Sequence, residues 1–126
     1  MTITNSQNHK RKYDLEERTF QFAKSVRLFV KTLPSTISNI EDGKQLIKAS
    51  GSVGANYREA NEALSKKDFL MRVKISRKEA KESLYWLRLI HETNDLSGSV
   101  DVEARRLIRE ADELKKIFSA IVEKCK

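Results

Sequence analysis

A line of basic residues recurs at helical spacing in the middle of the sequence. Lys74, Lys78 and Lys81 follow steps of four and three, which place side chains on one face of an α-helix. Cations spaced along a helix face can follow the phosphates of a nucleic acid, and an aromatic ring among them can stack on a base. We call this face the basic ridge, and its predicted nucleic-acid-binding residues are Lys67, Lys74, Lys78, Lys81, Tyr85 and Arg88.

The charge of the chain supports a binding role for the basic ridge without selecting the partner. The formal net charge is +7 over 126 residues, and residues 44–91 hold eleven basic against five acidic side chains. Such a surface favours RNA, DNA, acidic proteins or anionic lipid. The other interpretation is a solvated lysine face, in which Glu79 and Glu82 pair with lysines on neighbouring turns. The sequence leaves both interpretations open.

Side chains for catalysis or metal binding are scarce. His9 lies near the N-terminus and His91 near the end of a predicted helix, which leaves no histidine inside the predicted bundle. The chain lacks both the paired Glu-x-x-His motifs of a di-iron bundle and the cysteine and histidine ligands of a zinc site. The sequence therefore predicts a protein that is not an enzyme and uses no metal or cofactor.

The sequence also predicts where the protein resides. Cys125 is the single cysteine, so no internal disulfide can form, as is typical of a reducing compartment. The N-terminal residues contain no apolar core of signal-peptide length, and no stretch approaches the roughly 20 apolar residues that span a bilayer. We expect a cytoplasmic protein with no membrane segment.

Four helical segments must position these residues. Pro34 stops the first, because the residue before a proline is pushed out of the helical region. Ser38 with Glu41, and Ser65 with Asp68, have the spacing of capping boxes that begin the second and third helices. The predicted helices cover residues 14–33, 38–63 and 65–93, and a stretch from about 101 nearly to the terminus.

Each predicted helix carries apolar residues in alternating steps of four and three, which predicts one buried seam per helix. Leu64 ends the seam of the second helix and Cys125 that of the fourth. Short connections make consecutive helices antiparallel neighbours. The predicted fold class is therefore all-α, an antiparallel up-down-up-down four-helix bundle over residues 13–126. A disordered basic arm at residues 1–12 is predicted to precede it.

Other residues of the second and third helices predict contacts between helices or subunits. Gly51 and Gly54 lie inside a helix, where glycine costs roughly 1 kcal/mol relative to alanine, so we expect another helix to approach closely there. Glu59 and Arg72 lie equally far from the joint between the two helices, and we predict an ion pair between them. The predicted structural or interface residues are Asn56, Glu59, Arg72, Glu79, Glu82 and Trp86.

The same two helices carry several motifs of one family. They are Ser-Val-Gly-Ala-Asn-Tyr-x-Glu-Ala at Ser52–Ala60, Ser-Lys-Lys-Asp-Phe at Ser65–Phe69, Lys-Glu-Ala at 78–80 with Glu82, and Tyr-Trp-Leu at 85–87. In combination they resemble the four-helix bundle family of 23S rRNA-intervening sequence proteins. The match covers the second and third helices closely, while the first and fourth agree in length and pattern.

The resemblance implies a small bundle that assembles with itself, as a ring-shaped pentamer, through its helix surfaces. Some relatives are encoded inside insertions in large ribosomal RNA genes, and a similar bundle is an accessory to reverse transcriptase in diversity-generating retroelements. No catalytic residue comes with the resemblance. We predict a non-enzymatic, oligomeric bundle that binds RNA or RNA/DNA through the basic ridge. The alternative is a protein-interaction or accessory scaffold module without direct nucleic-acid contact.

Overall fold

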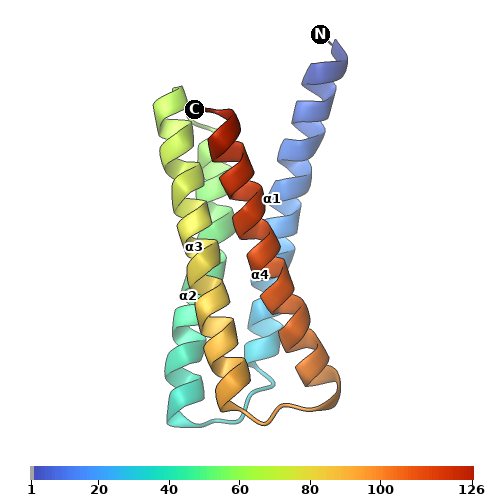
Figure 1. Ribbon diagram of the computed structural model, residues 1–126, viewed down its shortest axis with the longest axis vertical. Coiled ribbons are helices and arrows are strands. Elements are labelled where there is room, and N and C mark those ends of the chain that lie inside the picture. The colour runs from blue at the N-terminus through green and yellow to red at the C-terminus, as the bar shows by residue number, and fades with distance from the viewer. Residues whose placement is uncertain (1) are drawn as a thin grey trace.

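The computed structural model describes the backbone of residues 2–126 and the side chains of residues 14–126. This part of the chain forms four α-helices and no strand, which confirms the all-α class (Figure 1). The helices lie side by side, and the α1–α2 and α3–α4 connections are at the same end of the molecule (Figure 1). The helices are α1 (Thr2–Val30), α2 (Ile37–Asn61), α3 (Lys66–Thr93) and α4 (Gly98–Lys124).

The first helix ends at Val30, before the predicted end at residue 33. The Thr32 N–H donates to Phe29 O at 2.9 Å and the Leu33 N–H to Val30 O at 3.2 Å, so a tight turn closes the helix ahead of Pro34. The helix also begins at Thr2, well before the predicted start at residue 14, so its backbone continues through residues 2–12, where a disordered arm was predicted. The side chains of these residues lie outside the described part of the chain, and the domain boundary stays a prediction.

The starts of α2 and α3 test the two predicted caps. The Ser65 hydroxyl caps α3 as predicted, because it accepts a hydrogen bond from the Asp68 N–H at 3.1 Å. The predicted cap of α2 at Ser38 is wrong. Thr36, two residues earlier, has extended backbone angles, and its hydroxyl accepts from the Asn39 N–H at 3.1 Å. A hydroxyl residue at the end of the turn competes for the cap with one inside the first turn, and the earlier one is used here.

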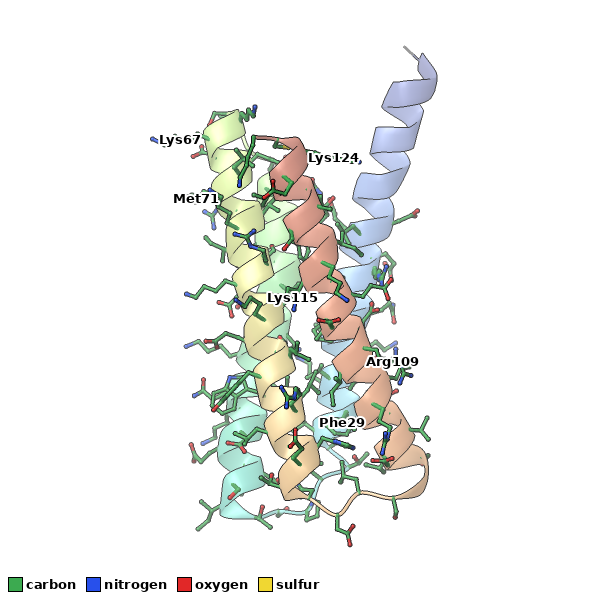
Figure 2. All side chains as sticks on the ribbon, in the orientation of Figure 1. Phe29, Lys67, Met71, Arg109, Lys115 and Lys124 are labelled. Carbon is green, nitrogen blue, oxygen red and sulfur yellow. The ribbon has the colours of Figure 1, made fainter. Side chains whose placement is uncertain are left out.

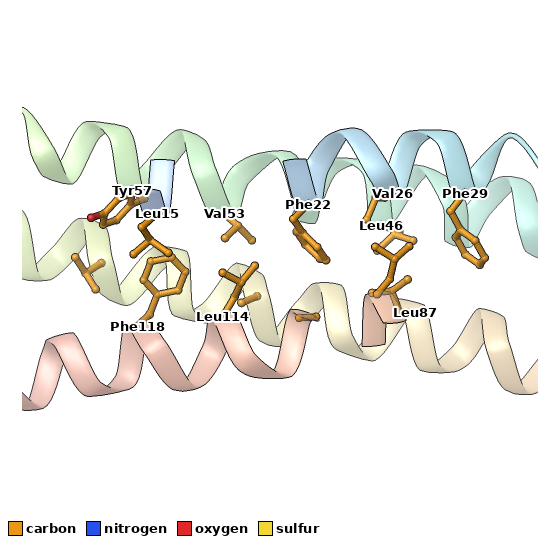
Figure 3. Close-up of a cluster of buried hydrophobic side chains, with 14 of the residues drawn as sticks. Leu15, Phe22, Val26, Phe29, Leu46, Val53, Tyr57, Leu87, Leu114 and Phe118 are labelled. Atoms are coloured by element: carbon orange, nitrogen blue, oxygen red, sulfur yellow. The ribbon is translucent and has the colours of Figure 1, made fainter. Parts of the chain in front are cut away.

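One apolar core runs between the four helices and buries most of the predicted seam residues (Figure 3). At one level of this core, the rings of Tyr57 from α2 and Phe118 from α4 lie 5.7 Å apart between centroids. The seam position predicted at Leu64 is wrong: this side chain is fully exposed because α2 ends at Asn61. The last turn of α4 buries Val122, and Cys125 is only partly buried.

Gly51 and Gly54 of α2 lie where α1 approaches, which confirms the close contact expected at these two positions. A Cβ atom on Gly54 would lie 2.8 Å from Thr19 Oγ1 and 3.1 Å from Thr19 Cβ. A Cβ atom on Gly51 would lie 3.0 Å from Nη2 of Arg27. The backbone of α2 therefore packs against side chains of α1 at these positions, and Gly54 is needed for that packing.

Polar contacts between α2 and α3 join residues in opposite sequence order. Asn39, near the start of α2, exchanges two amide hydrogen bonds of 2.8 Å with Asn94, which follows α3. Further along α2, the buried Ser76 hydroxyl donates to Val53 O at 2.9 Å. Both contacts satisfy polar groups at the α2–α3 junction, where an unpaired donor would cost roughly 1–3 kcal/mol.

Ion pairs join α4 to its two neighbours. The Arg18 guanidinium donates two 2.8 Å hydrogen bonds to Glu110, and it also lies 3.0 Å from a Glu113 oxygen. These carboxylates raise the pKa of Arg18 above its usual range. On the other side, His91 of α3 lies 2.8 Å from Asp101 of α4. Together these pairs fix α1 and α3 against α4.

Candidate nucleic-acid interface

The residues of the basic ridge lie on the solvent-facing side of α3. Val73, Ser76 and Ala80 on the opposite side of the helix are fully buried, so packing fixes which face of α3 points outward. Side chains in this part of α3, including Lys67 and Met71, project away from the other helices (Figure 2). The exposed residues are Lys67, Met71, Lys74, Lys78, Lys81, Tyr85 and Arg88.

The lysines of the basic ridge form no ion pair with any side chain of residues 14–126. Arg88 is the one ridge cation that does, with Glu92 at 3.3 Å on the next turn. Glu79 and Glu82 make no ion pair with the lysines beside them. The solvated-face interpretation relied on such pairs, so the described contacts leave the lysine charge uncompensated. An uncompensated row of cations on one face attracts polyanions.

An open depression of about 520 Å³ lies along the basic ridge. Its cations come from two turns of α3, and its aromatic residues from the turn that follows. Arg77 belongs to this set, although the ridge pattern in the sequence left it out. Its position three residues after Lys74 and four before Lys81 could have included it. The depression is lined by Lys74, Arg77, Lys78, Lys81, Glu82, Tyr85 and Trp86.

Tyr85 and Trp86 form the aromatic part of the depression. Their rings are nearly perpendicular, with centroids 4.9 Å apart and an interplanar angle of 83°. Tyr85 is 59% exposed, whereas Trp86 is partly buried against the core. Tyr85 also lines a second depression of about 260 Å³ with Arg88, Leu89 and Glu92. The tyrosine ring therefore lies between two open depressions, and the tryptophan ring packs against it nearly at a right angle.

Trp86 has one unusual feature. Its indole Nε1 is buried and has no hydrogen-bond acceptor among the described residues. A buried donor without an acceptor costs roughly 1–3 kcal/mol, so the fold retains this ring at a cost. The prediction that Trp86 contacts a neighbouring subunit is untested by a single chain.

The flank of α3 that faces α2 differs from the prediction in one pair. Arg72 donates to Asn56 Oδ1 at 3.2 Å, and within residues 14–126 it makes no ion pair with Glu59. The predicted Glu59–Arg72 pair is therefore wrong: Asn56, one turn before Glu59, has the better position across the joint. Glu79 and Glu82 line a shallow groove between α2 and α3 of about 150 Å³.

Groups for other chemistry are not brought together in the described part of the chain. Within it, no three His, Cys, Asp or Glu side chains are grouped as a metal ion requires. Its helices also contain no stretch both long and apolar enough to cross a bilayer. His91 is held by Asp101, which Arg105 also contacts at 2.9 Å.

The fold and the surface together define a class, a four-helix protein with an exposed basic helix face. Comparison with family models then identifies the family: residues 11–120 match the model of the 23S rRNA-intervening sequence proteins, and the chain belongs to this family. The motifs quoted from α2 and α3 had predicted this membership.

A solved structure supports the same assignment. It is a crystal structure of a protein of unknown function from the S23 ribosomal protein family of Bacteroides thetaiotaomicron. The two chains share 26% sequence identity and superpose with a TM-score of 0.75, over 89% of this chain and 97% of the other. A search of curated proteins gives no significant match. The comparisons thus fix the family and the fold and leave the function open.

Proposed function

We propose that this protein is a non-enzymatic bundle that binds nucleic acid through the basic ridge of α3, without a metal or cofactor. The observation that carries the proposal is a row of exposed lysines on the side of α3 opposite the core, which have no ion-pair partner within residues 14–126. The row also contains an exposed aromatic ring, which an electrostatic surface alone would not need. The family description refers to 23S rRNA, so RNA is the first polyanion to test.

The finer architecture forms part of this proposal. The contacts of Asn39 with Asn94 and of Val53 with Ser76 support an antiparallel up-down-up-down order of the helices. We further propose a homo-oligomeric ring, a pentamer first, which would bring several basic ridges into one assembly. Exposed Phe20 and Leu28 on the outer side of α1, 56% and 53% exposed, supply apolar surface for contacts between subunits. A cytoplasmic location agrees with an RNA partner.

A protein-interaction or accessory scaffold role is the second candidate. The observation that favours it is the exposed Tyr85 ring, which packs against the partly buried Trp86. In that case Tyr85 and Trp86 would be the centre of an interface, where aromatic residues are enriched. The same experiment separates the two candidates, because a scaffold without nucleic-acid contact would not bind an oligonucleotide.

The test is a fluorescence anisotropy titration of the purified protein with a labelled single-stranded RNA of twelve nucleotides. The combined variant Lys74→Ala, Lys78→Ala, Lys81→Ala removes three neighbouring ridge cations. Its affinity for the RNA should fall by roughly tenfold or more, because each lysine that contacts a phosphate contributes to binding. These side chains are exposed, so the fold should be retained and circular dichroism should be unchanged.

The matched control removes the same charge from other parts of the protein. Lys24→Ala, Lys31→Ala and Lys44→Ala change exposed lysines of α1, of the turn that follows α1, and of α2. This variant should lose less than about threefold in affinity, since only the long-range field changes. Equal losses in the two variants would mean that net charge, rather than the basic ridge, holds the RNA. No binding by the wild-type protein would reject the proposal.

A further inference from the structure

The depression on the basic ridge contains a carboxylate that phosphate binding does not explain. Of the seven side chains that line it, four are cations and Glu82 is the only acidic one. Glu82 forms no ion pair with the cations around it, within the described residues. Beside a nucleic-acid backbone this carboxylate would repel phosphate, so on a surface built for phosphate alone it would reduce affinity. The Glu82 carboxylate would contribute to binding if the depression received a base, because it could accept hydrogen bonds from the base.

Tyr85 supplies the face on which such a base would stack. It follows Glu82 by three residues, so the ring and the carboxylate lie on neighbouring turns of one helix face. The ring is 59% exposed and is held perpendicular to Trp86, which leaves it accessible from the depressions on either side. Stacking on an aromatic side chain contributes roughly 1–3 kcal/mol per base, and a base inside a duplex cannot reach it.

The combination of groups selects among the bases. An unpaired guanine presents two neighbouring N–H donors on its Watson–Crick edge, which match the two oxygens of one carboxylate. Its O6 and N7 atoms accept hydrogen bonds from lysine or arginine. Uracil offers a single donor between two carbonyl oxygens, and those oxygens would repel a carboxylate. A site with one carboxylate, several cations and an exposed ring therefore suits guanine best.

We propose that this depression binds one unpaired guanine of a single-stranded nucleic acid. In this site the base stacks on Tyr85, Glu82 accepts from its N–H donors, and Lys78 or Lys81 donates to its acceptor atoms. The neighbouring lysines contact the flanking phosphates. This inference rests on the proposed function, because it names the ligand of the same surface.

The experiment compares RNAs that differ in one base. The probes are a labelled twelve-nucleotide oligouridine and the same strand with a single central guanine, titrated against the wild-type protein at fixed salt. Guanine should increase the affinity about tenfold, at the lower end of what one good bidentate contact to a base contributes. The same guanine placed in a base-paired hairpin stem of equal length should lose this increase.

Variants of Glu82 and Tyr85 test whether the guanine preference arises in the depression. Glu82→Gln should reduce the guanine preference to less than about threefold, with oligouridine bound as well as before or better because a negative charge is gone. Glu79→Gln is the matched control: it removes the same charge one turn earlier, outside the depression, and should keep the tenfold preference. Tyr85→Ala should weaken the binding of both single-stranded RNAs. It should also remove the higher affinity for the single strand over the hairpin.

The outcomes separate this inference from the proposed function. Oligouridine binding that depends on Lys74, Lys78 and Lys81 but gains nothing from guanine would overturn the base site and leave the ridge as a phosphate-binding surface. A guanine preference that survives Glu82→Gln would also overturn it. Failure of every oligonucleotide to bind would reject the proposed function itself.

Discussion

At the scale of single residues, Gly51 and Gly54 of α2 give a matched pair. Alanine is favoured over glycine in a helix by roughly 1 kcal/mol, so either substitution gains helix propensity. At Gly54 the added Cβ would meet Thr19 Oγ1 at 2.8 Å and the Thr19 Cβ atom at 3.1 Å, which are held in the core. We predict that Gly54→Ala lowers the free energy of unfolding by about 1–3 kcal/mol, as overpacked sites do. Urea denaturation followed by circular dichroism measures it.

Gly51→Ala is the control for the same helix. Its Cβ would meet the guanidinium of Arg27, with Nη2 at 3.0 Å and Cζ and Nη1 at 3.9 Å, and this is the far end of a long, exposed side chain that can move. This variant should therefore keep the gain in helix propensity and be more stable than Gly54→Ala. If both substitutions stabilise the protein equally, α1 and α2 do not pack as closely at Thr19 as the structure has them.

The sequence predicts which side of a helix is buried better than it predicts which side chains pair with each other. The four-three pattern predicted one buried seam for each helix, and Val73, Ser76 and Ala80, which follow this spacing, are buried on one side of α3. It could not decide between Asn56 and Glu59 as the partner of Arg72. Both lie on one face of α2, and the choice depends on a shift of three residues along the helix axis, about 4.5 Å.

At the scale of helices, the α3–α4 junction should make stability depend on pH. Hydrogen bonds from Arg105 and His91 lower the pKa of Asp101 below its ordinary value of 3.8. A lowered pKa in the folded state means that the ionised carboxylate stabilises the fold. That stabilisation is complete above pH 3.8 and is lost as the pH falls through the lowered value. We expect Asp101→Asn to show a shallower loss of stability between pH 5 and pH 2 than the wild type.

Asp95→Asn is the matched control for this titration. Asp95 is an exposed aspartate of the α3–α4 connection that forms no ion pair within residues 14–126. Denaturation midpoints in urea, measured at several pH values, should show the wild-type slope for this variant. A wild-type slope for Asp101→Asn as well would mean that the pair with Arg105 and His91 does not form in solution.

The α1–α4 junction depends on Arg18. Glu110→Gln removes a carboxylate that accepts two 2.8 Å hydrogen bonds from Arg18 and is mostly buried. The Arg18 side chain is 35% exposed, so solvent screens the pair and the loss of stability should be about 1 kcal/mol. Glu103→Gln is the control, because among the described side chains Glu103 pairs only with Arg106, within α4. Its cost should be about 0.3 kcal/mol. Equal costs for the two variants would contradict the assigned role of Arg18.

Helix ends were the least predictable elements. Ser65 was correct as a cap because one hydroxyl residue stands alone at the joint between α2 and α3. Before α2, Ser35, Thr36 and Ser38 all offer a hydroxyl, and the turn after Pro34 decides which of them has extended backbone angles. The seam position predicted at Leu64 was wrong for a related reason, because the apolar pattern does not show that α2 ends at Asn61. Such choices are made by tertiary packing, which a periodic pattern does not contain.

At the scale of the whole molecule, the all-α fold and the family could be predicted from sequence. Few glycines, one proline and sustained four-three patterns exclude a sheet, and the motifs from Ser52 to Leu87 carry the family. The candidate site was predicted in outline. The ridge lysines and Tyr85 share a face by helical spacing, and the spacing of Arg77 could have added it to them, whereas the depression beside Glu82 becomes visible only when side chains are placed.

The proposed ring predicts the mass of the protein in solution. One chain has a mass of 14.5 kDa, so a pentamer would have about five times this value by light scattering or sedimentation. Phe20→Glu and Leu28→Glu on α1 should lower the mass if the apolar surface of α1 is the contact. A single-chain mass for the wild-type protein at micromolar concentration would reject the ring.

The salt dependence of RNA binding tests the central claim most directly, namely that the basic ridge of α3 contacts phosphates. For single strands, the slope of log K against log salt is roughly −0.7 per phosphate contact. The variant lacking Lys74, Lys78 and Lys81 should therefore have a slope shallower than that of the wild type by about 2. An unchanged slope would contradict the account, because it would place the phosphate contacts elsewhere on the protein.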